Sequence, residues 1–304
     1  MAKRFRAELA LALCTLLWGS TFVVVKNSLD RSSVFVFLAL RFTLAGVCMA
    51  AFRPGIFRAL RREEVFAGVR LGFFMFCGYA FQTAGLRYTT ASNSGFITGS
   101  SVVLVPLILA LFWGKRATLW VYFGTVAAGA GLYFLTVPAS GVAQLNRGDV
   151  LTFFAAVSYA VHIILVGEYA REHSAAALSV LQVLACALMA WLTAFGADAI
   201  RWQPMRFASG AELWIGIAVC AVFATAVAFS LQLWAQQYTT PSHAAILFTL
   251  EPVFAVITSY LVLGERLGLR SVTGAAMVLA GILAAELLGP PAAPESPDPL
   301  GEAS

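Results

Sequence analysis

Apolar runs of about twenty residues follow one another through most of this chain, with short polar segments between them. A run of that length matches the ~30 Å hydrocarbon core of a bilayer, because an α-helix rises about 1.5 Å per residue. In lipid, every backbone N–H and C=O has to be hydrogen-bonded within the protein, which leaves helices and closed barrels as spanning structures. The sequence therefore predicts an all-α polytopic membrane protein.

Ten such runs are present, and we expect each to form one transmembrane helix. They cover residues 7–26, 33–52, 65–86, 92–113, 118–137, 148–169, 175–196, 212–234, 242–263 and 270–288. Charged residues make up 12% of the chain, whereas a soluble domain carries roughly 25%. The chain therefore has too little charge to cover a surface that faces water on all sides.

The net charge of +5 raises the question of a nucleic-acid partner. The basic residues, however, lie in short segments beside the apolar runs, which is the pattern that sets the orientation of a membrane protein. The five cysteines lie inside apolar runs without the spacing of metal ligands, so we interpret them as packing residues. The sequence thus predicts a protein in contact with membrane lipid, with no nucleic-acid partner, no metal and no cofactor.

The second half of the chain repeats the first. The hexapeptide QYTTPS at 237–242 echoes RYTTAS at 87–92, and GER at 264–266 echoes GKR at 114–116 with the same offset. The first helices of the two halves match with a smaller offset, which pairs Trp18 with Tyr159, because nine extra residues precede the eighth helix. Turns that match in register over so long a stretch indicate a duplication.

Each copy holds five of the expected helices. We place the first repeat at residues 1–142, the second at 143–288, and a disordered, proline-rich tail at 289–304. Because five is an odd number, the two copies have to insert with opposite orientation. The expected fold is therefore two inverted five-helix repeats about a pseudo-two-fold axis in the membrane plane, an architecture of many transporters.

Two pairs of glycines occupy the last helix of each repeat, namely Gly124 with Gly131 and Gly274 with Gly281. Residues seven apart share one face of a helix, and small residues there let two backbones approach closely. We expect these glycines to serve helix packing, with a dimer seam as the alternative. Monomer and homodimer both stay open.

The order of these motifs resembles the EamA-type repeat of the drug/metabolite transporter superfamily. The shared features are Tyr-Thr-x-x-Ser at the start of a helix, a proline midway along it, a Gly-Glu-Arg-type turn and a glycine-rich closing helix. LEP at 250–252 and LGER at 263–266 resemble second-repeat motifs, and LWG at 17–19 resembles the first-helix motif. The resemblance covers about residues 8–288.

The resemblance implies a ten-helix carrier with a central cavity lined by helices 1, 3, 4, 6, 8 and 9. Members mostly export amino acids, other small metabolites or drugs, so we expect a secondary transporter in the inner membrane that works by alternating access on a small-molecule substrate. One feature departs from the superfamily. Small four-helix members couple protons through a glutamate within the first helix, and helix 1 here has no acid after Glu8.

Glu251 is a candidate for substrate or proton binding because it lies near the middle of the ninth expected helix. A carboxylate at that depth costs about 2.5–3.5 kcal/mol on insertion scales unless it faces a cavity or a partner. Its counterpart in the first repeat is Ser101, so the repeat does not require a charge here. The alternative is a structural role, in a pair with Arg41 or at the helix break made by Pro252.

Arg41 also lies near the midplane, about eight residues into the second expected helix. From there it can reach Glu251 or a carboxylate of the substrate. The second helix is peripheral in the resembling fold, which favours a structural role for Arg41.

The other candidates for the cavity lining are aromatic or polar residues deep in the expected helices. They are Trp18, Tyr79, Gln82, Asn93, Phe96, Tyr159, His162, Phe229 and Gln232. At that depth a polar aromatic side chain needs a hydrogen-bond partner or a wet cavity, and helix packing is the alternative role for each residue. Pro106 and Pro252 interrupt the fourth and ninth helices, where we expect hinges beside the site, with static kinks as the alternative.

Two other function classes have to be weighed, an intramembrane enzyme and a channel. The sequence holds no His-x-x-Glu-His metal motif and no evident Ser/His/Asp set. It also holds nothing like a selectivity filter, and its intramembrane acids form no ring. Both classes are therefore less well supported than a transporter, and the protein is not expected to be an enzyme.

Orientation gives the first testable prediction. In the first half, basic residues favour a cytoplasmic N-terminus by nine to three, whereas the second half opposes it by one to five. Because early helices usually dominate, both termini should be cytoplasmic and the segment 138–147 should lie outside. A single cysteine placed by Ser140→Cys in a cysteine-free background should react with an impermeant maleimide added to intact cells. Labelling from the cytoplasmic side alone would overturn this orientation.

Overall fold

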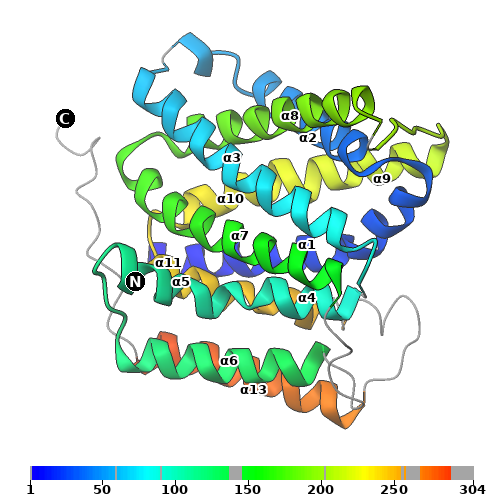
Figure 1. The fold of residues 1–304 in the computed structure, drawn as a ribbon. Coiled ribbons are helices and arrows are strands. Elements are labelled where there is room, and N and C mark those ends of the chain that lie inside the picture. The colour runs from blue at the N-terminus through cyan, green and yellow to red at the C-terminus, as the bar shows by residue number, and fades with distance from the viewer. Residues whose placement is uncertain are drawn as a thin grey trace.

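The computed structural model describes residues 2–58, 60–89, 91–136, 146–201, 203–254, 257 and 268–288, and these are almost wholly helical (Figure 1). The helices are α1 Ala2–Arg31, α2 Val34–Ala51, η1 Ile56–Arg58, α3 Arg62–Gly85, α4 Ala91–Gly99, α5 Ser101–Phe112, α6 Leu119–Thr136, α7 Arg147–Glu172, α8 Ala175–Ala199, α9 Ala211–Ala221, η2 Val222–Val227, α10 Ala228–Ala235, α11 Pro241–Phe248 and α13 Leu269–Leu288. An isolated antiparallel bridge joins Ser32 and Phe207. The predicted all-α architecture is confirmed.

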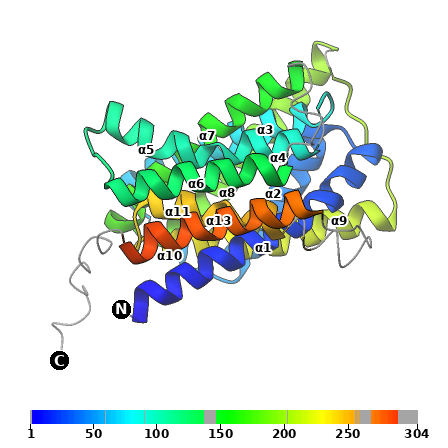
Figure 2. The same ribbon diagram turned by 90° about the horizontal axis from the view of Figure 1, so that it is seen from below.

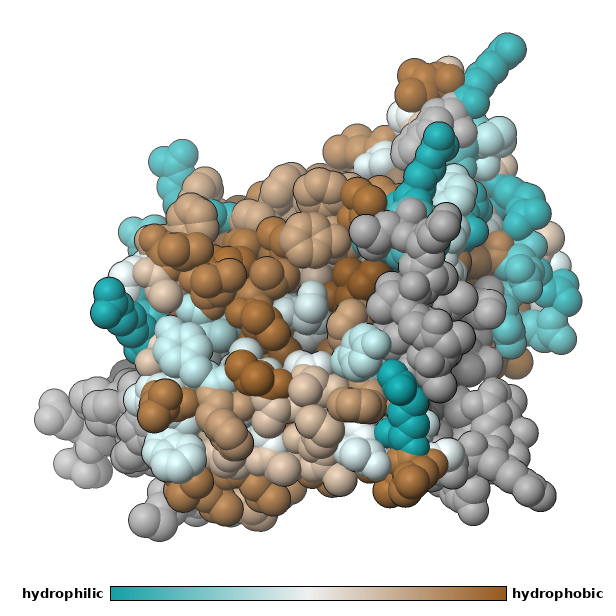
Figure 3. All heavy atoms as spheres, turned by 60° about the horizontal axis from the view of Figure 1, so that its bottom comes forward, coloured by the Kyte–Doolittle hydropathy of each residue, from teal (hydrophilic) through white to brown (hydrophobic). Residues whose placement is uncertain are grey.

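Six helical stretches of the described residues are long and apolar enough to cross a membrane. They are Val34–Ala51, Arg62–Gly85, Ser94–Phe112, Arg147–Glu172, Ala175–Ala199 and Ala211–Ala235, and Leu119–Phe134 and Leu269–Ala285 are shorter apolar helices. Apolar side chains cover the middle of the face in Figure 3, with hydrophilic ones gathered towards its left and right edges. A multi-pass membrane protein follows. The number of ten helices stays a prediction, because most of 255–267 lies outside the described residues.

The fourth expected helix is divided into α4 and α5, and α11 ends before the ninth expected helix does. At both places a hydroxyl residue bonds back to a carbonyl three residues earlier, through its N–H and through its side chain. Ser100 bonds to Ile97 in this way, and Thr249 bonds to Ile246. The repeat pairs Ser100 with Leu250, the residue next to Thr249, so the two breaks match to within one residue.

The eighth expected helix contains a π-helical turn, η2, between α9 and α10. A π-helix bonds from residue i to i+5 and widens the helix by one residue per turn, often at a functional site. Here the Thr225 hydroxyl donates to the carbonyl of Cys220, five residues earlier, at 2.8 Å. No pattern in the sequence indicated this turn.

The packing of the bundle places α3 between α7 and α8, and α1 against α9, η2, α10 and α11. The helices α6 and α13 lie side by side at one edge (Figures 1 and 2). Their contact runs through the glycines that the sequence singled out. A Cβ added at Gly124 would lie 2.6 Å from the carbonyl oxygen of Gly281, and one added at Gly131 would lie 2.6 Å from that of Gly274. The predicted packing role of these glycines is confirmed.

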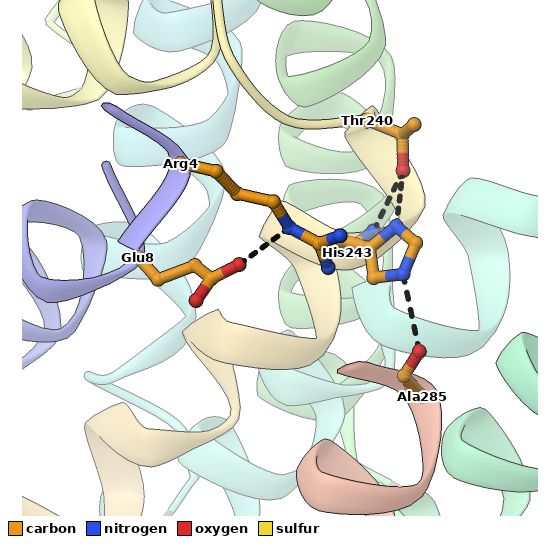
Figure 4. Close-up of polar contacts among 5 residues, drawn as sticks. All are labelled: Arg4, Glu8, Thr240, His243 and Ala285. Carbon is orange, nitrogen blue, oxygen red and sulfur yellow. Dashed lines mark hydrogen bonds and ion pairs between the residues drawn. The ribbon is translucent and has the colours of Figure 1, made fainter. Parts of the chain in front are cut away.

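At the end of the bundle that holds the N-terminus, His243 of α11 connects neighbouring helices (Figure 4). Its Nε2 lies 3.3 Å from the carbonyl oxygen of Ala285, near the end of α13, so Nε2 carries the donated proton. The Thr240 hydroxyl lies 2.6 Å from Nδ1, which is then the acceptor. Arg4 and Glu8 of α1 pair beside the ring at 2.7 Å. Three helices that are distant in sequence thus meet around one imidazole.

Two glycines on α6 allow a matched test of the seam between α6 and α13. Gly131→Ala forces a Cβ against backbone atoms of α13 at 2.6 and 2.7 Å, whereas the nearest neighbour of a Cβ at Gly129 is a Val103 methyl at 3.6 Å. Gly131→Ala should destabilise the protein by about 1–3 kcal/mol through overpacking. Gly129→Ala should be neutral or slightly stabilising. Thermal unfolding in detergent measures both, and equal melting temperatures for the two variants would contradict the seam.

Candidate functional site

Five aromatic residues from five helices meet inside the bundle. The Trp18 ring (α1) lies 5.5 Å from Phe229 (α10) and 5.3 Å from Phe248 (α11), measured between ring centroids. The Tyr159 ring (α7) lies 5.6 Å from Tyr79 (α3), and Tyr79 lies 6.2 Å from Phe229. We call these five residues the aromatic cluster. The sequence predicted four of them as lining residues, and it missed Phe248.

The contacts within the aromatic cluster follow the repeat. Tyr159 is the counterpart of Trp18 in the second half, and Phe229 is the counterpart of Tyr79. The contact between Trp18 and Phe229 therefore corresponds to the contact between Tyr159 and Tyr79, at almost the same distance. Tyr79 and Phe229 are counterparts of each other, so exchanging the two halves leaves the contact between them unchanged.

Hydrogen bonds fix the polar ends of these rings while leaving part of their surface accessible. The Trp18 indole donates to the carbonyl of Ala224 at 2.9 Å, and the Tyr159 hydroxyl donates to Gln82 Oε1 at 3.1 Å. Gln82 Nε2 in turn donates to Thr98 Oγ1 at 3.1 Å. Trp18, Tyr159 and Gln82 are all half-buried. They combine a fixed orientation with free surface, as the lining of a binding site requires.

Arg41 of α2 is buried at the border of the cluster, with 3% of its surface exposed. Its Nε donates to Thr225 Oγ1 at 2.8 Å, and its Nη2 lies 3.2 Å from the Ala224 carbonyl and 3.4 Å from the Tyr79 hydroxyl. The guanidinium carbon stands 4.9 Å from the centroid of the Tyr79 ring, which is within cation–π range. The π-helical turn thus supplies two of the three oxygens that hold Arg41.

Glu251 is half-buried and follows the break at Thr249 by two residues. Within the part of the chain that the structure describes, its carboxylate takes part in no ion pair, with Arg41 or with any other residue. The structural pair that the sequence left open is therefore not formed. Of the two charged residues, it is Arg41 that contacts the aromatic cluster, through the hydroxyl and the ring of Tyr79.

The remaining predicted residues divide into those near the cluster and those away from it. His162 is buried, donates from Nε2 to Gln182 Oε1 at 2.9 Å and packs 6.0 Å from Phe229. Gln232 is buried and donates to Gln236 at 2.9 Å, while its Oε1 has no partner among the described residues.

Phe96 packs 5.8 Å from Tyr133 of α6, so it contributes to helix packing, which was its alternative role. Asn93 belongs to α4, and its side chain lies outside the described part of the structure.

The two prolines relate differently to the helix breaks. Pro252 lies three residues beyond Thr249, and its ring crowds the carbonyl of Phe248, where α11 ends. Pro106 is buried inside α5, six residues beyond Ser100. The break at Ser100 follows instead from the run Gly99-Ser100-Ser101, because glycine and serine are weak helix formers. A hinge role for either proline stays a prediction.

The sequence missed Phe248, which packs on Trp18. Its counterpart in the first half is Thr98, which was not among the predicted residues either and which bonds to Gln82. Phe248 shares with Phe96 and Phe229 the only signal that could have found it, an aromatic side chain deep in an expected helix. Thr225, by contrast, reaches Arg41 only because η2 rotates it there, and no sequence signal indicates that turn.

Comparison with known proteins finds matches to both halves of the chain. The EamA-like transporter family matches residues 5–137 and again residues 146–286. An uncharacterized transporter of Archaeoglobus fulgidus is 36% identical over 285 residues, which is 94% of this chain and 87% of that protein. The threonine/homoserine exporter RhtA of Escherichia coli (strain K12) is 27% identical over 235 residues, which is 75% of this chain and 74% of that one.

A solved crystal structure shares the fold with a TM-score of 0.77 over 93% of this chain and 99% of that chain, at 20% identity.

The separation of Arg41 and Glu251 makes a prediction about stability. Removing one member of a buried ion pair costs about 3–5 kcal/mol, and removing both recovers much of that loss. Because no such pair is formed, Arg41→Gln and Glu251→Gln should show a coupling energy of less than about 1 kcal/mol in a double-mutant cycle. Unfolding in detergent gives the four stabilities. A double variant that is clearly more stable than Arg41→Gln alone would show that the two charges pair in solution.

Proposed function

Because the chain belongs to the EamA-like transporter family, we propose that it is a secondary transporter that exports small metabolites by alternating access around the aromatic cluster. The family and the named relatives make the protein a membrane transporter and not an enzyme. The observation that carries the proposal is the pair of equivalent aromatic contacts, Trp18 with Phe229 and Tyr159 with Tyr79, on either side of the contact between Tyr79 and Phe229.

A two-fold relation between the halves supports alternating access. In a fold of two inverted five-helix repeats, placed at 1–142 and 143–288, each contact between the halves has an equivalent contact between the counterpart residues. The glycine seam has this property, because Gly124 near the start of α6 meets Gly281 late in α13, and Gly131 meets Gly274. The two helices therefore run in opposite directions. A common site on the axis then opens to one side or to the other as one repeat moves against the other.

The broken helices also support a site at this place. Transporters commonly bind substrate where helices are interrupted in corresponding parts of the two halves. Here Thr98 precedes the break at Ser100 and bonds to Gln82, and Phe248 precedes the break at Thr249 and packs on Trp18. Glu251 lies just beyond the second break, two residues after Thr249. We assign it the binding of a substrate ammonium group or of a coupling proton.

Amino acids are the proposed substrate class. Similarity to a threonine/homoserine exporter over 75% of this chain supports them. The site also offers what an amino acid needs, namely a carboxylate for the ammonium group and aromatic faces for the cation and the side chain. In the proposed arrangement the protein lies in the inner membrane with both termini in the cytoplasm.

Glu251→Gln tests this function because it keeps the shape of the side chain and removes its charge. Since Glu251 takes part in no ion pair in the described structure, the variant should keep its melting temperature in detergent. Flux of L-threonine and of a panel of other amino acids in proteoliposomes should fall by at least about tenfold, the cost of losing one charge-assisted hydrogen bond. Measuring flux with and without a pH gradient separates a proton-binding role from a substrate-binding role.

The matched control is Glu63→Gln, which removes an exposed acid from the first turn of α3 and should change neither stability nor flux. A stable Glu251→Gln protein that transports at the wild-type rate would remove Glu251 from the site. Flux in the wild type that does not saturate with concentration would favour a channel over a carrier.

A further inference from the structure

We propose that Arg41 determines substrate selectivity by binding a carboxylate group, so that the site accepts metabolites that carry a carboxylate and rejects amines that lack one. This proposal rests on the transport function proposed above and concerns the same site. It is carried by the charge balance of the buried guanidinium, by the geometry of its hydrogen bonds and by its position beside the aromatic cluster.

The first observation concerns the charge of the Arg41 guanidinium. Arg41 lies in the interior of α2, with 3% of its surface exposed. A guanidinium stays protonated in proteins, and a cation at such depth in a membrane protein is costly unless it faces a partner or a pathway. Its partners are a hydroxyl of Thr225, the carbonyl of Ala224 and the hydroxyl of Tyr79. All three are neutral oxygens, and no carboxylate of the described residues lies within 4.0 Å of the guanidinium.

The hydrogen bonds leave one edge of the guanidinium available. Its Nε and Nη2 are held by α3 and η2, which fixes the plane of the group. Its Nη1 donates to no residue in the described part of the chain. A hydrogen bond from a guanidinium N–H to a carboxylate is charge-assisted and therefore strong. Because the other nitrogens fix the plane of the group, Nη1 is preorganised to donate such a bond to an anion.

The position of Arg41 connects it to the aromatic cluster at two points. The Tyr79 hydroxyl that accepts from Arg41 belongs to the ring that packs on Tyr159 and Phe229. The Ala224 carbonyl that accepts from Arg41 also accepts from the Trp18 indole. A ligand among these rings consequently has the guanidinium at one border.

The repeat shows that the fold does not need this charge. The counterpart of Arg41 in the second half is Gln182, which is buried and accepts a hydrogen bond from His162. The same place in the other repeat is thus occupied by a shorter, neutral side chain. The fold of the repeat therefore does not require a charge at this position, although Arg41 also bonds α2 to α3 and η2.

The first part of the test uses the wild-type protein in proteoliposomes. Uptake of radiolabelled L-threonine is challenged with unlabelled compounds that differ at the carboxyl group, namely L-threonine, its methyl ester and the corresponding amino alcohol. We expect L-threonine to compete at least about tenfold better than the other two, because a charge-assisted hydrogen bond contributes about 1.5–3 kcal/mol. Equal competition by the ester and the amino alcohol would overturn the proposal without any variant.

The second part uses Arg41→Gln, which installs the residue that the other repeat already holds. Its apparent affinity for L-threonine should fall at least about tenfold, and its affinity for the amino alcohol should stay unchanged or rise. A merely structural Arg41 would instead weaken both ligands alike, and that result would contradict the proposal. Arg41→Lys keeps the charge without the planar fork and should give an intermediate loss for L-threonine. If Arg41→Gln fails to fold, Arg41→Lys and the wild-type competition decide.

The outcomes separate this proposal from the function on which it rests. A wild-type protein that shows saturable flux of amines lacking a carboxylate would refute the role of Arg41 and keep the transporter. A wild-type protein without saturable flux of any compound in the panel would refute the proposed function itself.

Discussion

Lipid offers no hydrogen bonds, and this constraint governs every departure from regular helix in the described part of the protein. The break at Ser100 and the break at Thr249 are each closed by a hydroxyl that bonds to a carbonyl three residues earlier. In the π-helical turn the Thr225 hydroxyl bonds to Cys220, and the Ala224 carbonyl takes both the Trp18 indole and Arg41. Trp18 and Arg41 thus bond to the irregular backbone of the π-helical turn and also belong to the candidate site.

The duplication gives the bundle its symmetry, and the two charged candidate residues lie where the two copies differ. The copies agree in the glycine seam and in the positions of their helix breaks. They differ at two pairs of counterparts: Arg41 corresponds to Gln182, and Glu251 corresponds to Ser101. A symmetric scaffold thus carries a cation from one half and an anion from the other. Such a dipolar site suits a ligand that itself carries both signs.

Much of the fold could be predicted from the sequence, because a helix that crosses lipid has a typical length and close packing between such helices requires small residues. Apolar runs gave the helices, and glycines seven apart gave the seam between α6 and α13. Trp18, Tyr79 and Tyr159 were singled out as polar aromatic residues in mid-membrane, and the structure brings them into one cluster, while their role in binding stays a prediction. The direction in which a single side chain points was harder to predict. Phe96 has the same aromatic character but turns to Tyr133 of α6, and only the packing of α4 decides which way it points.

The π-helical turn could not be predicted because it depends on partners that are distant in the sequence. Residues 222–227 are apolar or small and would suit an ordinary α-helix equally well. Arg41 and Trp18 come from α2 and α1, and both bond to this turn. No comparison of the two halves reveals a turn that depends on tertiary contacts.

One alanine near the end of α13 joins three helices that belong to different parts of the bundle. The carbonyl of Ala285 receives the His243 imidazole of α11, and its methyl group occupies the space beside Gly124 of α6. Any displacement of the start of α11 must therefore break the imidazole contact or carry α13 and α6 along with it. The outer pair of helices is therefore coupled to α11, the helix that ends just before Glu251.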